Sequence, residues 1–470
     1  MTHWSVWRQY FVIDRSRATG ELHGLLDPDK IDLDGLHGYL AKLFLPGIDF
    51  DVVQPPVWQS EAAERRHLSD GPDLVMLPLQ LYREKDVDAL VKAFNQYLED
   101  YYRRHHQSDP VYLGLSPSLA VVSADYCGVT EASGYARGTR KYAERLIGLD
   151  RLTQAERDGI NGQDVNVVLV DEGINKNFCV PAGQWGTGWA LPGGVAPGLT
   201  PIERARHSAM VIRNILAIAP KARLFDLPLI RQPKYGDLID FIDSAHAALQ
   251  KVRDDIHDWQ TYSPGKFPGP WIIVNAWAPF DLRREFPKGA YSNNPLNKFN
   301  ILINDIVSRG IDVVFCAGNC GAFSPDGRCG PNDMGPGRSI LGAASLPRVL
   351  SVGAVRVDGT WCGFSSQGPG QPNLSGDKPD LCAPSGFAEN HDMFAVTNGT
   401  SGASAIAAGV VAALRTKWRP QTIGPDPDTL RSCLYSEATP PPPSPRSNRQ
   451  FGHGILNIYN AYRRLHLLYP

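Results

Sequence analysis

The stretch VNVVLVD, residues 165–171, decides the fold class. Five of its first six residues are apolar, and runs of the same texture recur at 222–230, 271–277, 311–319 and 348–355. Such runs lack the alternation of polar and apolar residues that a half-exposed strand shows, so they predict strands buried on both faces. Segments with apolar residues at helical spacing separate several of them, as in Leu238, Ile239, Ile242 and Leu249. We therefore predict an α/β fold with a mostly parallel sheet and helices on both faces.

The first 125 residues have a different pattern. Apolar residues fall at helical spacing over 33–43 and 87–101, and extended runs occupy 74–82 and 111–122. A strand, a helix and a second strand within so short a span predict a small N-terminal α+β domain over residues 1–125.

The remaining chain divides on texture and size. Its 470 residues exceed one domain of roughly 100–200 residues. Residues 126–164 are mixed and polar and are interpreted as a linker and the start of the main unit. Residues 165–470 form the predicted main domain, with the ligand crevice at the edge where its parallel strands end.

Composition excludes several classes of function. The chain has 47 basic and 49 acidic residues and a formal charge of −2, so no basic field indicates binding to nucleic acid or to an anionic membrane. The N-terminal residues lack the apolar segment of a signal peptide, and no run approaches the roughly 18 apolar residues of a membrane span. These features predict a cytoplasmic protein without nucleic-acid or membrane partners.

Eight cysteines are too few for a disulfide scaffold, and none forms a C-x-x-C pair. Cys316, Cys320 and Cys329 lie close together in the sequence, which leaves open a local metal site or a disulfide. The alternative is a set of buried thiols with one loop cysteine in a reducing cytoplasm.

Four polar residues stand at the ends of the α/β elements. Asp171 directly follows a buried strand, and His207 stands at the start of an amphipathic helix. Asn319 follows another buried strand, and Ser401 lies in the small-residue run NGTSGASAIAAGVVAAL at 398–414, where a helix N-terminus offers free N–H donors. Each residue taken alone is equally compatible with a helix cap or a turn.

Together these residues resemble the subtilisin-like serine peptidases (subtilases), whose chain order is Asp, His, Ser. The resemblance rests on eight ordered stretches and covers residues 130 to 470. These stretches are VDEGIN (170–175), RHSAMV (206–211), APKARLFDLPLI (219–230), CAGN (316–319), FSSQGPG (364–370), KPDLCAPSG (378–386), GTSGAS (399–404) and FGHGILN (451–457).

The resemblance implies a subtilisin-like three-layer fold and hydrolysis of peptide bonds in a polypeptide substrate. It makes Ser401 the nucleophile, His207 the general base and Asp171 the residue that orients His207. Asn319 and the Ser401 N–H would stabilise the oxyanion.

The resemblance also places the substrate beside NAWAPF (275–280), so that Ala276, Trp277 and Ala278, with Gly318, are the predicted substrate-binding residues. The short interval after His207 leaves no room for a calcium-binding insertion found in many family members. No obligatory metal or cofactor is expected.

The sequence departs from the family pattern at several positions. Glu172 stands where the family usually has a small hydroxyl residue, and Gly402 stands where methionine is common. After His207, the family's usual Gly-Thr-His is replaced by three other residues, the first of which is Ser208. Trp277 either forms a bulky cleft wall or packs inward, and Pro279 removes a backbone donor. The cleft features favour a restricted specificity.

Several interpretations stay open. The N-terminal region is either an inhibitory, propeptide-like domain, as in a zymogen, or a docking domain that recruits substrate or a regulator. An inhibitor or regulatory protein is the expected partner besides the polypeptide substrate. The same acyl-enzyme would also serve a peptide ligase or macrocyclase. The third alternative is a binding protein that keeps the fold without catalysis.

Overall fold

The computed structural model describes most of the chain from residue 138 onward and several segments before it. The described residues are 7–14, 21–26, 32–44, 50–52, 74–81, 93, 112–117, 138–191, 194–230, 238–285, 289–322, 325–389, 395–420, 422, 424–441 and 447–470.

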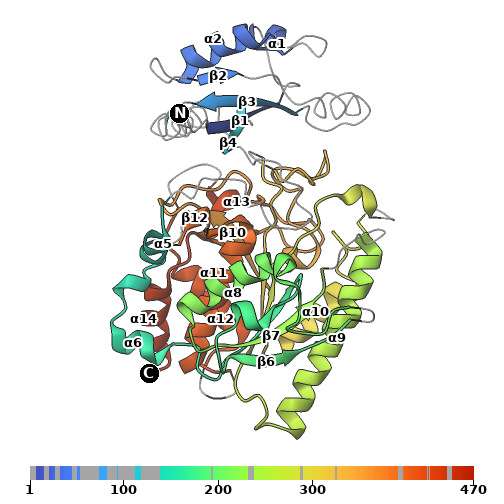
Figure 1. Ribbon diagram of the computed structural model, residues 1–470, viewed down its shortest axis with the longest axis vertical. Coiled ribbons are helices and arrows are strands. Elements are labelled where there is room, and N and C mark those ends of the chain that lie inside the picture. Colours follow the sequence, from blue (N-terminus) through green and yellow to red (C-terminus); the bar gives the residue numbers. More distant parts are fainter. Residues whose placement is uncertain are drawn as a thin grey trace.

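A seven-stranded sheet forms the centre of the structure (Figure 1), with the order β11-β10-β9-β8-β5-β7-β6 and parallel pairing between every pair of neighbours. The predicted α/β class and mostly parallel sheet are confirmed. Its strands are β5 (Asn166–Asp171), β6 (Trp185–Gly188), β7 (Arg223–Pro228), β8 (Trp271–Asn275), β9 (Asp312–Cys316), β10 (Leu350–Val355) and β11 (Leu381–Pro384).

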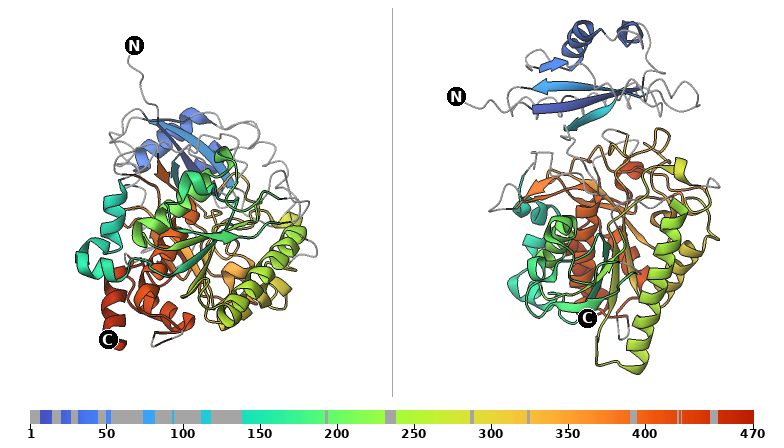
Figure 2. Two further views of the ribbon diagram at one scale, coloured as in Figure 1. Left: turned by 60° about the horizontal axis from the view of Figure 1, so that its bottom comes forward. Right: turned by 45° about the vertical axis from the view of Figure 1, so that its right-hand side comes forward.

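Helices cover both faces of this sheet, which gives three layers (Figures 1 and 2). On one face, α8 (Arg206–Ile218) and α11 (Gly399–Lys417) share a core with alternate residues of the strands. On the other face, α9 (Leu238–Tyr262) and α10 (Lys298–Ser308) pack on a second, aromatic-rich core. The strands are thus buried on both sides, as their continuous apolar sequence requires.

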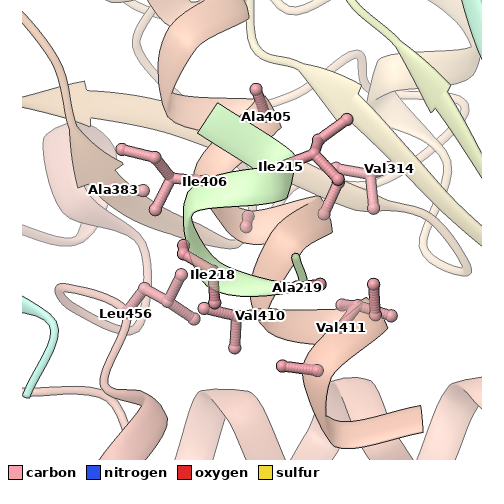
Figure 3. Close-up of a cluster of buried hydrophobic side chains, with 14 of the residues drawn as sticks. Ile215, Ile218, Ala219, Val314, Ala383, Ala405, Ile406, Val410, Val411 and Leu456 are labelled. Atoms are coloured by element: carbon pink, nitrogen blue, oxygen red, sulfur yellow. The ribbon is translucent and has the colours of Figure 1, made fainter. Parts of the chain in front are cut away.

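Small residues let α8 and α11 approach closely (Figure 3). Ile215 and Ile218 of α8 lie against Ala405, Ile406 and Val410 of α11 in the same core. A Cβ atom added at Gly409 would lie 3.0 Å from the Ile215 carbonyl oxygen, a tight contact that the absence of a side chain at Gly409 avoids. The two helices that carry His207 and Ser401 are therefore held against each other along much of their length.

Shorter elements complete this part of the chain. No helix among the described residues is both long and apolar enough to cross a membrane. These elements are α5 (Arg140–Leu146), η2 (Leu149–Arg151), α6 (Gln154–Gly159), α7 (Lys176–Cys179), η3 (Ile202–Arg204), η4 (Leu282–Arg284), η5 (Gly342–Ser345), β12 (Phe387–Ala388), β13 (Val396–Thr397), α12 (Pro427–Ser436), α13 (Ser447–Phe451) and α14 (Ile458–Leu468).

The N-terminal segments form a separate four-stranded sheet of order β2-β3-β1-β4, in which β1 pairs antiparallel with both β3 and β4. Its strands are β1 (Trp7–Asp14), β2 (Phe50–Val52), β3 (Leu74–Leu81) and β4 (Tyr112–Pro117), and its helices are α1 (Glu21–Leu25) and α2 (Leu33–Phe44).

The N-terminal predictions have mixed outcomes. The extended runs at 74–82 and 111–122 contain β3 and β4, and the helix at 33–43 is α2. The helix predicted over 87–101 lies outside the described residues apart from one position. The domain division at residue 125 stays a prediction, because 118–137 lie outside the described residues as well.

The strand order places a site beside β5. From β5 the chain builds β6 and β7 on one side, and then β8 to β11 on the other. Ligands of open α/β sheets bind at the carboxyl ends of the strands, next to such a reversal of order. Asp171 is the last residue of β5, and Ala276 and Asn319 follow β8 and β9 at the same edge.

Candidate active site

Asp171 and His207 form a hydrogen-bonded pair at this edge. The Nδ1 atom of His207 lies 2.9 Å from Oδ1 and 2.8 Å from Oδ2 of Asp171, and the carboxylate is 1% exposed. An ionised carboxylate only accepts hydrogen bonds, so Nδ1 carries the proton and the neutral ring presents Nε2 as its basic atom.

Nε2 of His207 is buried and has no hydrogen-bond partner among the described residues. Burial acts to lower the pKa of His207, but the attraction and hydrogen bond of Asp171, with a further contribution from Glu172, raise it above its ordinary value. The imidazole is therefore a buried base whose Nδ1 is bound by the Asp171 carboxylate and whose Nε2 lies on the opposite side of the ring.

Ser401 lies in the first turn of α11, which Asn398 caps by accepting the Gly399 N–H. Its Oγ donates a hydrogen bond of 3.0 Å to the Ala276 carbonyl oxygen, directly after β8. The structure thus brings Ser401 to the predicted substrate-binding segment. It shows no hydrogen bond from Ser401 to Nε2 of His207.

Asn319 is fixed by the residue that precedes Ser401. Its Oδ1 accepts hydrogen bonds from the Thr400 N–H and hydroxyl, at 2.9 and 2.8 Å. Because a backbone N–H can only donate, the amide oxygen must face Thr400, and the Nδ2 group is the end that is left to donate elsewhere. Thr400 is not among the site residues predicted from the sequence, although its position beside Ser401 was a usable signal.

Gly318 requires its lack of a side chain. Its φ is +99°, and an added Cβ would lie 2.9 Å from Ser366 Oγ and 3.5 Å from the Ala278 Cβ. Gly318 and Ala278, both predicted to bind substrate, are therefore neighbours across the edge of the sheet.

Trp277 packs inward, which decides between the two alternatives for this residue. Its side chain is 2% exposed and lies against Phe241 and Phe315, with ring centroids 4.9 and 5.8 Å away. Its Nε1 donates to Asn275 Oδ1 at 3.1 Å. The indole is thus part of the core and does not form a cleft wall. Within the segment 276–278, Ala276 is also buried and Ala278 is half-exposed.

Glu172 is also buried at the site, at 5% exposure. Its Oε1 accepts the His207 N–H at 2.9 Å, and its own N–H donates to Asp171 Oδ1 at 2.8 Å. Burial raises the pKa of Glu172 to about 7, and the Asp171 charge adds to this, whereas His207 opposes it.

A disulfide joins Cys320 to Cys329, so the loop that follows Asn319 is closed on itself. Cys316 is a buried thiol outside this bond. The structure therefore pairs two of the three cysteines that the sequence left undecided. Within the loop, the Arg328 guanidinium pairs with Asp326 and lies 4.1 Å from the Phe280 ring centroid.

No group of three or more His, Cys, Asp or Glu side chains in the described part of the chain is placed to hold a metal ion.

Comparison with known families identifies the domain. Residues 268–454 match the model of the Peptidase_S8 subtilase family, a stretch that contains Asn319 and Ser401 and begins after Asp171 and His207. Over residues 268–454 the chain is therefore similar to the subtilases, which are serine peptidases and thus hydrolases.

Solved structures with the same architecture include a lanthipeptide protease, at 17% identity and a TM-score of 0.50, with 69% of this chain and 93% of that chain covered. MycP1 with its N-terminal propeptide removed is 20% identical with a TM-score of 0.46, and the match covers 68% of this chain and 96% of that chain. The prenylagaramide maturation protease PagA is 20% identical with a TM-score of 0.46, and the match covers 68% of this chain and 98% of that chain. The likeness to the lanthipeptide protease concerns the fold alone. No match was found among curated protein sequences.

Proposed function

We propose that the chain is a serine endopeptidase in which Ser401, His207 and Asp171 act as the catalytic triad. The observation that carries the proposal is the bond between Asp171 and Nδ1 of His207, which leaves at the site edge a buried Nε2 without a hydrogen-bond partner in the part of the chain that the structure describes. Such an imidazole takes the serine proton as the hydroxyl attacks the scissile carbonyl, and then returns it to the leaving amine.

The oxyanion of the tetrahedral intermediate would be bound by the Asn319 Nδ2 group and the Ser401 N–H. The orientation that Thr400 imposes on the Asn319 amide supports the first donor. The position of Ser401 in the first turn of α11 supports the second, because the first four N–H groups of a helix have no partner within it.

Catalysis then requires one local change at Ser401. Its hydroxyl donates to the Ala276 carbonyl in this structure and must turn to donate to His207 when substrate is attacked. An extended substrate would lie along residues 276–278 and Gly318. The buried Trp277 gives no support to a bulky cleft wall, so the proposed restricted specificity rests on Pro279, which offers no N–H to a substrate strand.

We also propose that the N-terminal region controls the peptidase activity and that the protein is cytoplasmic. The N-terminal sheet is compatible with an inhibitory domain that is removed on activation, or with a docking domain for an inhibitor or regulatory protein. Deletion of residues 1–125 raises basal cleavage in the first case and changes only partner binding in the second. Disulfides are typical of oxidising compartments, so the redox state of Cys320 and Cys329 in the chain isolated from cells tests the proposed location.

The decisive experiment compares the full-length chain with Ser401→Ala on a diverse peptide pool by mass spectrometry, together with labelling by a fluorophosphonate probe. We expect cleaved products and labelling that are both lost in Ser401→Ala and kept in Ser432→Ala, a change at an exposed serine of α12. Absence of cleavage and labelling in the wild type overturns the proposal in favour of a binding protein. Product masses also separate hydrolysis, which adds water, from ligation or macrocyclisation.

A further inference from the structure

Helix α8, which carries His207, begins without a cap of its own. The residue at its N-cap position is Ala205, whose side chain accepts no hydrogen bond, and the first turn contains no acidic residue. Alanine is among the poorest N-cap residues, and the N-terminus of a helix carries a partial positive charge. Arg206 adds to that charge, and the uncapped N–H groups of this helix start need an acceptor from elsewhere.

Glu172 supplies the acceptor from the neighbouring strand end. Its carboxylate reaches from the residue after β5 to the His207 N–H, at 2.9 Å, and interacts with the Ser208 N–H as well. Asp171 meanwhile holds the imidazole of the same histidine. Two consecutive carboxylates thus hold His207 at two points, one at its main chain and one at its side chain.

The two carboxylates are also tied to each other, because the Glu172 N–H donates to Asp171 Oδ1 at 2.8 Å. A shift of the Glu172 main chain therefore moves the acceptor of the imidazole. We infer that Glu172 is a positioning residue, which caps α8 at His207 and sets the charge that the imidazole experiences. This inference rests on the proposed function of His207 as the general base.

The charged groups around this pair come from four elements. Asp171 on β5 and Glu172 beside it face His207 on α8, and both raise the pKa of His207. Arg328, on the disulfide-closed loop, lowers it. Asp226 on β7 interacts with Asp171. Loss of the Glu172 charge therefore removes one of the two acidic groups that favour the protonated imidazole.

Two substitutions separate the two roles. Glu172→Gln keeps an oxygen that can accept the His207 N–H but carries no charge, whereas Glu172→Ala removes both. The matched control is Glu156→Ala, because Glu156 caps the start of α6 through Thr153 on an exposed helix. That change removes a carboxylate cap of the same kind at a place without substrate contacts.

We expect Glu172→Ala to lower kcat about tenfold with a KM within about twofold of wild type, since a misplaced base affects the chemical step. Glu172→Gln should keep most of the kcat and move the acidic limb of the kcat/KM profile to lower pH. The limb moves to lower pH because only the neutral imidazole is a base. Loss of the negative charge at position 172 lowers the pKa of His207, so the imidazole stays neutral to a lower pH. Glu156→Ala should leave kcat and the profile unchanged.

A titration independent of cleavage completes the test. The full-length chain with ¹³C-labelled histidine is titrated by NMR, and the His207 signal is identified by its loss in His207→Gln. A lower pKa of His207 in Glu172→Gln supports the inference. An unchanged titration, or a kcat of Glu172→Ala equal to that of Glu156→Ala, overturns it. If the wild type neither cleaves peptides nor reacts with the fluorophosphonate, the proposed function fails, and the titration still reports on Glu172.

Discussion

Thr400 donates two hydrogen bonds to Oδ1 of Asn319, from its N–H at 2.9 Å and from its hydroxyl at 2.8 Å. The same hydroxyl accepts the Gly318 N–H at 3.2 Å. The residue before the proposed nucleophile therefore aligns the proposed oxyanion donor and the strand end that carries it. Neither residue is exposed, so this alignment is set before any substrate arrives.

Substitution of Thr400 by valine tests that alignment. The change keeps the shape and the backbone N–H but removes the hydroxyl, so the Asn319 amide loses one of two restraints. We expect kcat to fall about tenfold with little change in KM, less than the roughly 10²–10³-fold loss expected for Asn319→Ala. The control is Thr422→Val, since Thr422 is exposed and bonds only within its own turn. A kcat of Thr400→Val equal to wild type would contradict the prediction.

Gly402 is explained by a close neighbour in space. A Cβ at this position would lie 2.6 Å from Cγ2 of Thr397, closer than real Cβ atoms come to other atoms. We expect Gly402→Ala to destabilise the fold by about 1–3 kcal/mol and to lower activity, because the strain falls on the turn that holds Ser401. Urea unfolding and peptide cleavage measure the two effects.

A second substitution relieves that strain. Thr397→Ser removes the methyl group and keeps the hydroxyl that bonds with Asn214. The double variant Gly402→Ala with Thr397→Ser should therefore recover most of the stability, which gives a clear coupling energy in a double-mutant cycle. Gly159→Ala is the control, since nothing lies near a Cβ there. Additive effects of the two changes would rule out the steric explanation.

Asp226 makes stability depend on pH. It is fully buried, its Oδ2 accepts the Gly198 N–H, and its Oδ1 has no partner among the described residues. Burial raises its pKa from 3.8 to about 7. The folded chain then binds this proton more tightly than the unfolded chain, so the contribution of Asp226 to stability is fully present below pH 4 and is lost as the pH rises through 7, by up to about 4 kcal/mol.

Asp226→Asn removes this titration and keeps an oxygen for the Gly198 N–H. We expect the variant to be more stable than wild type above pH 7 and to differ little from it near pH 4. Urea unfolding at several pH values measures the difference. A difference that does not change with pH would show that the pKa of Asp226 is the same in the folded and the unfolded chain.

The sheet was largely predictable because its strands are buried on both sides. The strand VNVVLV at 165–170 needs apolar residues on both faces, and this requirement is visible in one stretch of sequence. Strand β6, Trp185–Gly188, was missed because it is short, half-buried and contains two glycines. Its place is decided by pairing with β7, which local sequence does not report.

The site shows the same limit. The residue types of Asp171, His207, Asn319 and Ser401 are readable, because each follows a strand or opens a helix. The contact of Glu172 with the His207 N–H joins positions 35 residues apart, and only the fold brings them together. The direction of Trp277 was equally undecidable, since an apolar aromatic ring suits a core and a cleft wall alike.

We expect the buried ion pair between Arg415 and Asp312 to matter strongly for the free energy of unfolding of the domain. Arg415, in the last turn of α11, donates to both Asp312 oxygens at 2.6 and 2.8 Å and to the carbonyls of Trp418 and Pro425. Arg415→Met leaves a buried carboxylate unpaired, so we expect a loss of about 3–5 kcal/mol in the free energy of unfolding. Lys298→Met, which breaks an exposed pair, should cost no more than about 1 kcal/mol. Equal losses in the two variants, measured by urea unfolding, would show that Asp312 reaches water when its partner is removed.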